Sequence, residues 1–267
     1  MSEQFDPARL AQKAKRWVVK VGTSVLTDEK EGKVSRRRVE SVASTIVNLW
    51  KKGKEAILVT SGAIGIGMEV LDLKHRPTDL AKLQAAAATG QGKLIQWYTG
   101  RMEEEGFHAA QVLLTRGDLE DRQRRHNVKA TLETLLSAKI VPIINENDTV
   151  STEEIRYGDN DILSANVATL IEANVLLILT DVGHLIGLDG HPIHHVSQIT
   201  QQMEQAAKGT EKASSTGGMK TKLEAAKHVM SQNIPLAVMT AGGFAKLINL
   251  PADKTQTNTE QEGTWFV

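Results

Sequence analysis

The chain has 267 residues, and its 32 lysines and arginines balance 32 aspartates and glutamates. This neutral balance argues against a nucleic-acid coat protein or a membrane-surface binder, and no stretch reaches the run of about 18 apolar residues that a membrane-spanning helix needs. The chain has no cysteine, which excludes disulfides, thiolate zinc sites and cysteine nucleophiles. We therefore expect a cytoplasmic protein without nucleic-acid or membrane partners.

Short apolar runs alternate with stretches of helical periodicity along the chain. The runs are 17–21, 56–59, 109–114, 140–144, 175–179 and 236–239. Each run is too short for a helix, and the alternation is typical of a mainly parallel sheet that helices cover on both faces. The fold class is therefore α/β. No repeat or clean linker interrupts the chain, so we expect a single domain over residues 1–267.

Two long helices are predicted between these runs. Residues 35–53 place their apolar positions on one helical face, with Ser35 as the N-cap. Residues 79–105 are rich in alanine, and the glycines within this segment, Gly90 and Gly92, predict a close-packing point or a kink.

The remaining polar segments predict loops. Residues 150–158 predict a hairpin at the rim of a pocket, and residues 183–200 and 208–218 show no apolar periodicity. A helical pattern then follows the sequence TGGMKTK at 216–222. A glycine pair and a lysine at a helix N-terminus can bind the phosphates of a nucleotide.

Polar residues follow the apolar runs, at the sheet edge where open α/β folds bind ligands. They occupy 20–24, 60–65, 145–148 and 180–181. Small and hydroxyl-bearing turns of this kind expose backbone N–H groups to an anion. The sequence therefore predicts a phosphate site at the carboxyl ends of the strands.

Three common motifs are missing from these turns. The chain has no GxxxxGK[ST] loop, the glycines at 62, 65 and 67 do not form GxGxxG, and Ser61 lies in VTSGA rather than GxSxG. P-loop kinases, dinucleotide-binding oxidoreductases and serine hydrolases are therefore disfavoured.

The sequence GDND at 158–161 is an acidic cluster just before a predicted helix. Alone it would indicate a helix N-cap. Together with Asp148, however, Asp159 and Asp161 could orient a lysine, a magnesium-bound water or a substrate ammonium group.

Seven segments together resemble the glutamate 5-kinases of the amino acid kinase family. They are WVVKVGTSVLT (17–27), VTSGAIGIG (59–67), LLTRGDLEDRQR (113–124), VPIINENDTV (141–150), GDNDILSA (158–165), LTD (179–181) and TGGMKTKLEAA (216–226). The resemblance runs in order over nearly the whole chain. It implies ATP-dependent phosphorylation of the γ-carboxylate of L-glutamate to L-glutamyl 5-phosphate, the first step of proline biosynthesis. It also implies an αβα sandwich around a mostly parallel sheet of about eight strands.

The same resemblance implies roles for individual residues. Lys20 and Lys222 match lysines that stabilise the transferring phosphoryl group, and Asp161 matches the acid that holds them. The implied glutamate-binding residues are Ser61, Asp148, Asn160 and Asp159. The implied ATP-binding residues are Lys20, Thr180, Asp181, Thr216, Gly217, Gly218, Met219, Lys220, Thr221 and Lys222, with Lys220 expected to be exposed.

The implied reaction suits these residue types. A substrate carboxylate with a pKa of about 4.3 is already ionised, so no general base is required. The reaction needs positioning and positive charge on the phosphoryl group. Magnesium is expected to arrive on the ATP phosphates, without a metal site of the protein's own.

Some features depart from the family pattern or leave choices open. The chain ends at EGTWFV, which resembles the closing strand of the kinase domain, so we expect the short form without a C-terminal PUA domain. TDVGHLIGLDGHP stands where TDxxGLYxxDP is usual, so this nucleotide loop lacks the usual Asp-Pro pair. The alternatives are a kinase of acetylglutamate, aspartate, carbamate or UMP, and an inactive module that senses glutamate or proline. Proline feedback inhibition and a homodimer or homotetramer are also implied.

Several conspicuous residues have ordinary explanations. The basic segments 36–38 and 121–126 predict solvated helix faces, because the neutral chain lacks the basic patch of nucleic-acid proteins. His191, His194 and His195 have no acidic partner at metal-ligand spacing and are expected at the surface.

Overall fold

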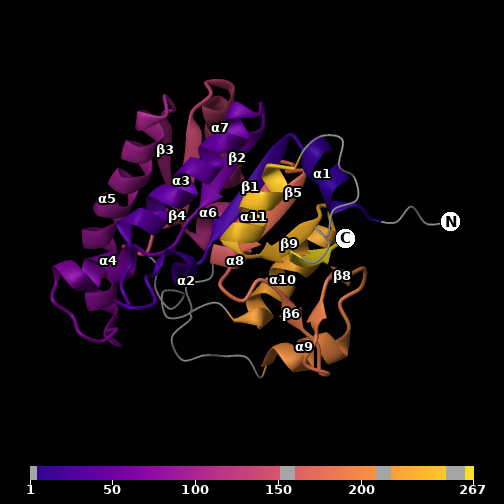
Figure 1. Ribbon diagram of the computed structural model, residues 1–267. Helices are drawn as coiled ribbons and strands as arrows, with labels where there is room; N and C mark the ends of the chain where they lie inside the picture. Colours follow the sequence, from indigo (N-terminus) through magenta and orange to yellow (C-terminus); the bar gives the residue numbers. More distant parts are fainter. Residues whose placement is uncertain (1–4, 151–159, 209–217, 251–261) are drawn as a thin grey trace.

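The computed structural model describes residues 5–150, 160–208, 218–250 and 262–267 (Figure 1). The elements in chain order are α1 (Pro7–Lys13), β1 (Arg16–Val21), α2 (Thr23–Leu26), α3 (Arg36–Lys51), β2 (Glu55–Val59), α4 (Ala63–Val70), α5 (Leu80–Glu104), β3 (Ala109–Leu114), α6 (Arg116–Glu120), α7 (Arg122–Ser137), β4 (Val141–Glu146), α8 (Asn160–Leu170), β5 (Val175–Leu179), β6 (Leu185–Ile186), β7 (Pro192–Ile193), β8 (His195–Val196), α9 (Gln201–Lys208), α10 (Met219–Met230), β9 (Leu236–Met239), α11 (Ala241–Ile248) and β10 (Gly263–Phe266).

Eight of these strands form one mainly parallel sheet. Their order is β3-β4-β2-β1-β5-β9-β10-β8. Neighbouring strands pair in parallel except β9 and β10, which are antiparallel. The predicted α/β class and the mostly parallel sheet are confirmed, and the segment EGTWFV supplies β10.

The sheet separates two apolar cores, because successive side chains of a strand point to opposite faces. Trp17, Val19 and Val21 of β1 pack on the face covered by α3, α5 and α11. Val18 packs on the other face with residues of α7, α8 and α10. Figure 1 shows α3 and the yellow α11 crossing in front of the strands, which completes a three-layer αβα sandwich. The alternation assigns Lys20 to the α8 and α10 side.

Both predicted long helices are present. Ser35 is the N-cap residue of α3, although its side chain makes no capping hydrogen bond. Asp79 caps α5 by accepting a hydrogen bond from the Lys82 backbone N–H. Gly90 marks the predicted close-packing point: a Cβ there would lie 1.9 Å from the carbonyl oxygen of Ala63 in α4. A Cβ at Gly92 would meet nothing within 4 Å, so that glycine has no packing role.

The prediction of a loop over 183–200 is wrong in part. β6 and β7 form a small antiparallel hairpin, and β8 pairs in parallel with β10. The Leu185 backbone N–H also donates to Thr264 Oγ1 at 2.7 Å. Strands of two residues are too short to show periodicity, and the partner of β8 in β10 lies about 70 residues along the chain, so local patterns cannot reveal them. The predicted hairpin (150–158) and loop (208–218) lie almost wholly outside the described residues.

Two surface expectations can be compared with the structure. Residues 121–126 are exposed, as are His191 and His195, whereas His194 is half-buried beside His184. Within the parts of the chain that the structure describes, no helix is both long and apolar enough to cross a membrane.

Candidate active site

The candidate site lies where the strand order reverses. β2 follows β1 on one side, whereas β5 joins β1 on the other. Crossover helices leave opposite faces at such a point, which opens a crevice beyond the carboxyl ends of the strands. The turns after β1, β2, β4 and β5 all reach this edge, as the sequence predicted.

Two lysines and an aspartate form a buried ion network there. Asp161 lies in the first turn of α8, Lys20 near the end of β1, and Lys222 in the first turn of α10. Lys20 Nζ is 2.6 Å from Asp161 Oδ1, and Lys222 Nζ is 3.2 Å from Asp161 Oδ2. Asp161 is 0% exposed and each lysine 6%. Three elements far apart in the sequence thus converge on one carboxylate.

The network keeps Asp161 ionised. Burial by itself would raise the pKa of this carboxyl, but the charges of Lys20 and Lys222 outweigh burial and hold its pKa well below the usual range. The Thr221 hydroxyl lies 2.8 Å from Asp161 Oδ2. Two lysine side chains thus flank one carboxylate at the carboxyl ends of the strands.

Asn160, next to Asp161, organises the neighbouring turns. Its Nδ2 lies 2.8 Å from the Thr60 carbonyl oxygen, 2.8 Å from Ser61 Oγ and 3.1 Å from Asn145 Oδ1. The side chain therefore ties the start of α8 to the ends of β2 and β4. Its Oδ1 is buried and has no hydrogen-bond partner among the described residues. A buried acceptor of this kind suits a ligand with an N–H group.

A cavity of about 100 Å³ adjoins these residues. The N-terminus of α4 forms one wall, where Gly62 has a φ of 105°, a left-handed conformation that favours glycine. The polar side chains that line the cavity are Thr23, Ser61, Arg76, Asn145, Glu146, Asp148 and Asn160. Three of the four residues with implied roles in glutamate binding thus border one cavity.

Asp148 is a strongly perturbed carboxyl group of this cavity. Burial and the negative charge of Glu146 raise its pKa to about 7, although the positive charge of Arg76 opposes the shift. The group therefore titrates near neutral pH, and a cationic ligand would favour its ionised form.

The turn after β5 supplies the implied nucleotide residues. Asp181 Oδ1 accepts hydrogen bonds from Thr180 Oγ1 at 3.0 Å and from Ser24 Oγ at 3.3 Å, which ties this turn to the one after β1. Gly218 and Met219 at the start of α10 are half-buried, and Lys220 is exposed. Asp159, Thr216 and Gly217 lie outside the described residues.

Sequence reasoning missed three contributors. Thr221 was assigned only to ATP, but its hydroxyl also contacts Asp161. Asn145, within the INENDTV segment, joins Asn160 to Gln91 of α5. Arg76 reaches the cavity from the connection between α4 and α5, and no pattern in that connection marks it. Asn145 could have been found from its place in the motif, whereas Arg76 required the fold.

Another cavity, of about 190 Å³, lies between α3 and α11. Among its lining residues, Ser41 and Thr45 provide the only side-chain polar groups, and none of these residues is ionisable. This cavity therefore lacks the charged side chains that the network of Lys20, Asp161 and Lys222 provides. No group of three or more acidic or histidine side chains in the described parts of the chain could hold a metal ion.

Comparison with known proteins agrees with this geometry. The model of the amino acid kinase family matches residues 15–240. The chain belongs to the amino acid kinase family. Among solved structures, a carbamate kinase from Giardia lamblia bound to AMP-PNP has a TM-score of 0.64 at 16% identity and covers 96% of this chain and 99% of its own. At that identity, the likeness shows the amino acid kinase fold alone.

Curated relatives of higher sequence identity include glutamate 5-kinases. The chain is 47% identical to a glutamate 5-kinase of Moorella thermoacetica over 89% of this chain and 64% of that protein. It is 45% identical to a glutamate 5-kinase of Symbiobacterium thermophilum over 84% of this chain and 87% of that protein. The resemblance to glutamate 5-kinases is confirmed. The chain spans less than two thirds of the length of the Moorella relative.

Proposed function

We propose that this chain catalyses the ATP-dependent phosphorylation of the γ-carboxylate of L-glutamate, which forms L-glutamyl 5-phosphate for proline biosynthesis. The observation that carries the proposal is the buried network of Lys20, Asp161 and Lys222 at the switch point. A protein that only bound an amino acid would gain little from burying two cations, since such charges are costly without a transferring anion to stabilise.

The proposed reaction needs no proton transfer to the protein. A γ-carboxylate oxygen of glutamate attacks the terminal phosphorus of ATP, a new O–P bond forms, and the bond to the bridging oxygen breaks to release ADP. Lys20 and Lys222 stabilise the negative charge on the transferring group. Asp161 positions both ammonium groups and does not contact the substrate in this scheme.

The cavity beside the network would hold the rest of glutamate. Ser61 and the N-terminal backbone of α4 offer donors to a carboxylate, whereas Asn160 Oδ1 and Asp148 offer acceptors to the ammonium group. Asp159 is proposed to assist at the ammonium group from outside the described residues.

ATP would bind along the turn after β5 and the start of α10. The proposed contacts are Lys20, Thr180, Asp181, Thr216, Gly217, Gly218, Met219, Lys220, Thr221 and Lys222. We propose that magnesium enters on the ATP phosphates, as is usual for this ion, where it would neutralise phosphate charge.

A hydroxamate assay tests the proposal. The chain is supplied with MgATP, hydroxylamine and L-glutamate, and acetylglutamate and aspartate are run in parallel. Glutamate-dependent hydroxamate and ADP are expected. If only acetylglutamate or aspartate gives hydroxamate, the chain is a kinase of that acid and the assignment of glutamate as the substrate is wrong. Glutamate binding without product would favour the sensing module instead.

Lys222→Ala tests the role of the network in turnover. Turnover should be abolished with little change in glutamate affinity, because Lys222 acts on the phosphoryl group. Lys227→Ala is the matched control: this exposed side chain lies on the same helix and pairs with Glu204 at the surface. Turnover that survived in Lys222→Ala would contradict the assigned role. Proline inhibition, the oligomeric state and the cytoplasmic location stay predictions.

A further inference from the structure

The substrate cavity has an unusual balance of charge for a site that accepts a dicarboxylate. Glu146 and Asp148 both line it, and Arg76 is the only cationic side chain among its described lining residues. Lys20 and Lys222 are not among those lining residues, since Asp161 holds them in the adjoining network. An anionic group deep in this cavity would therefore meet two carboxylates and one guanidinium.

Glutamate carries two different charges at the end that is not phosphorylated. Its ammonium group is suited to Asp148 and to Asn160 Oδ1, which has no hydrogen-bond partner in the described part of the chain. Its α-carboxylate is attached to the same carbon atom, so it must lie within a few ångströms of the same acidic side chains. In a partly desolvated cavity, that proximity is repulsive unless a cation compensates for it.

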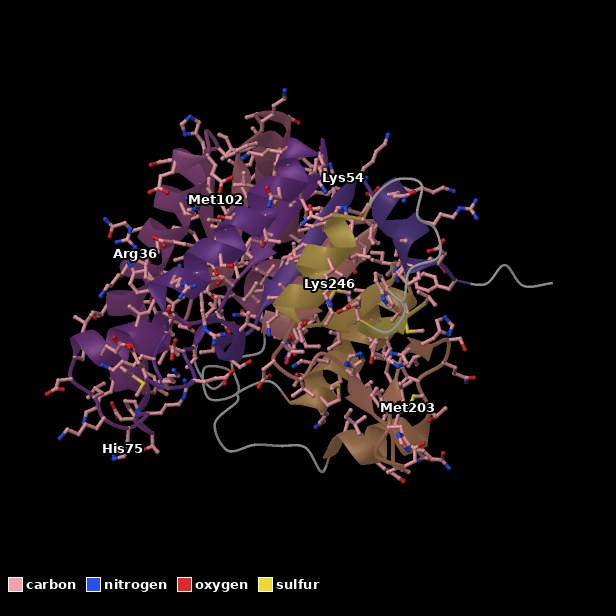
Figure 2. All side chains as sticks on the ribbon, viewed as in Figure 1. Arg36, Lys54, His75, Met102, Met203 and Lys246 are labelled. Atoms are coloured by element: carbon pink, nitrogen blue, oxygen red, sulfur yellow. The ribbon has the colours of Figure 1, made fainter. Side chains whose placement is uncertain are left out.

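Arg76 is in the place to compensate. It belongs to the connection between α4 and α5, it lines the same cavity as Glu146 and Asp148, and it is followed by Pro77, which restricts the backbone. Figure 2 labels the preceding residue, His75, at the outer edge of the molecule beside α4. Arg76 is exposed as a residue, but partial burial of its guanidinium lowers its pKa, and the negative charge of Asp148 opposes that shift. Both side chains line the same cavity.

We propose that Arg76 binds the α-carboxylate of the amino-acid substrate and thereby determines specificity for glutamate. The inference rests on the proposed function, because it concerns the same cavity. A guanidinium can donate two parallel hydrogen bonds to one carboxylate, which a lysine cannot reproduce. In the empty site, Arg76 offsets the charge of Asp148. With glutamate bound, the substrate ammonium pairs with Asp148, and Arg76 pairs with the α-carboxylate instead.

Substrate analogues separate this role from a structural one. 4-Aminobutyrate keeps the ammonium and one carboxylate but lacks the α-carboxylate, whereas glutarate keeps both carboxylates but lacks the ammonium. Arg76→Met, Arg76→Lys and the parent chain are compared by glutamate KM and kcat with MgATP, by calorimetric Kd for glutamate, and by the inhibition constants of both analogues. Arg125→Met, an exposed arginine of α7, is the control for the substitution itself.

The expected result is selective. Arg76→Met should raise the KM and Kd for glutamate and the inhibition constant of glutarate by about 10- to 100-fold, the range of a lost charge-assisted pair. The inhibition constant of 4-aminobutyrate should change less than about twofold, and kcat less than about threefold. Arg76→Lys should fall between the parent and Arg76→Met, and Arg125→Met should match the parent.

Other results would overturn the inference. If Arg76→Met weakens the binding of glutamate and 4-aminobutyrate but not that of glutarate, Arg76 acts by positioning Asp148 and does not bind the α-carboxylate. If no constant changes, Arg76 has no part in the site. A parent chain that binds glutamate but forms no acyl phosphate would refute the proposed function alone, because the Kd series would still decide the role of Arg76. A parent chain that does not bind glutamate would refute both.

Discussion

The contact between α4 and α5 provides a stringent test of how the fold positions the cavity that we propose for glutamate. Gly90 of α5 faces α4 so closely that an added Cβ would lie 1.9 Å from the Ala63 carbonyl oxygen and 2.5 Å from the Gly67 backbone nitrogen. Both nearest atoms belong to backbone, so no side chain can rotate away. In Gly90→Ala, α4 would have to retreat by about 1.5 Å to restore an ordinary contact of 3.4 Å.

The expected cost follows from this displacement. Overpacking a well-filled interface by one methyl group costs about 1–3 kcal/mol, and more where backbone must move. The higher helix propensity of alanine relative to glycine offsets at most about 1 kcal/mol of this cost. We therefore expect Gly90→Ala to lose about 3 kcal/mol of unfolding free energy. Because the N-terminus of α4 lines the cavity, the KM for glutamate should rise while the KM for ATP stays near its original value.

Gly92→Ala is the matched control, since it makes the same substitution two residues further along α5. An added Cβ there meets nothing within 4 Å, so helix propensity alone should stabilise the chain by about 0.5–1 kcal/mol. Thermal and urea unfolding of both variants measure the difference, and steady-state kinetics measure the two KM values. Equal stability of the two variants would refute the close-contact reasoning.

Three further predictions concern the buried polar groups. Asp161→Asn leaves the two lysines without their anion and should cost about 3–5 kcal/mol. Because the pKa of Asp161 is lowered in the folded state, this loss of unfolding free energy should be present above pH of about 4 and shrink as the pH falls. Unfolding measurements at several pH values that show no such trend would contradict the network. Asp148 has a raised pKa of about 7, so glutamate affinity should increase from pH 6 to pH 8, and Asp148→Asn should remove this trend. The same variant should be more stable than the parent at pH 8, on the order of 1–2 kcal/mol, and equal to it near pH 4, because a raised carboxyl pKa costs stability only above its unfolded value. Tyr98→Phe should cost about 1–2 kcal/mol in urea unfolding, because it removes the buried 2.9 Å hydrogen bond to Thr60; an unchanged midpoint would show that Thr60 finds another partner.

The sequence alone was sufficient for the elements whose signal is local. The apolar runs predicted six neighbouring strands of the sheet, β3 to β9 in its order. The alternation within 17–21 is enough to separate Lys20 from Val19 and Val21 on opposite faces of β1. The helix over 79–105 was predicted nearly to its ends from its alanine-rich composition, and the structure adds Asp79 as its cap. Period and capping depend on neighbours within a few residues, so they can be read without a fold.

The candidate site was predictable only as a set of residue types. The motifs named Lys20, Asp161 and Lys222 through their resemblance to a family, but nothing local relates residues 20, 161 and 222. The pairing of β8 with β10 and the arrival of Arg76 at the cavity were equally hidden. Tertiary structure decided these points, because distances across a sheet are set by strand order and crossover direction. The same structure decided the protonation of Asp161 and Asp148, since burial and neighbouring charge exist only once the chain has folded.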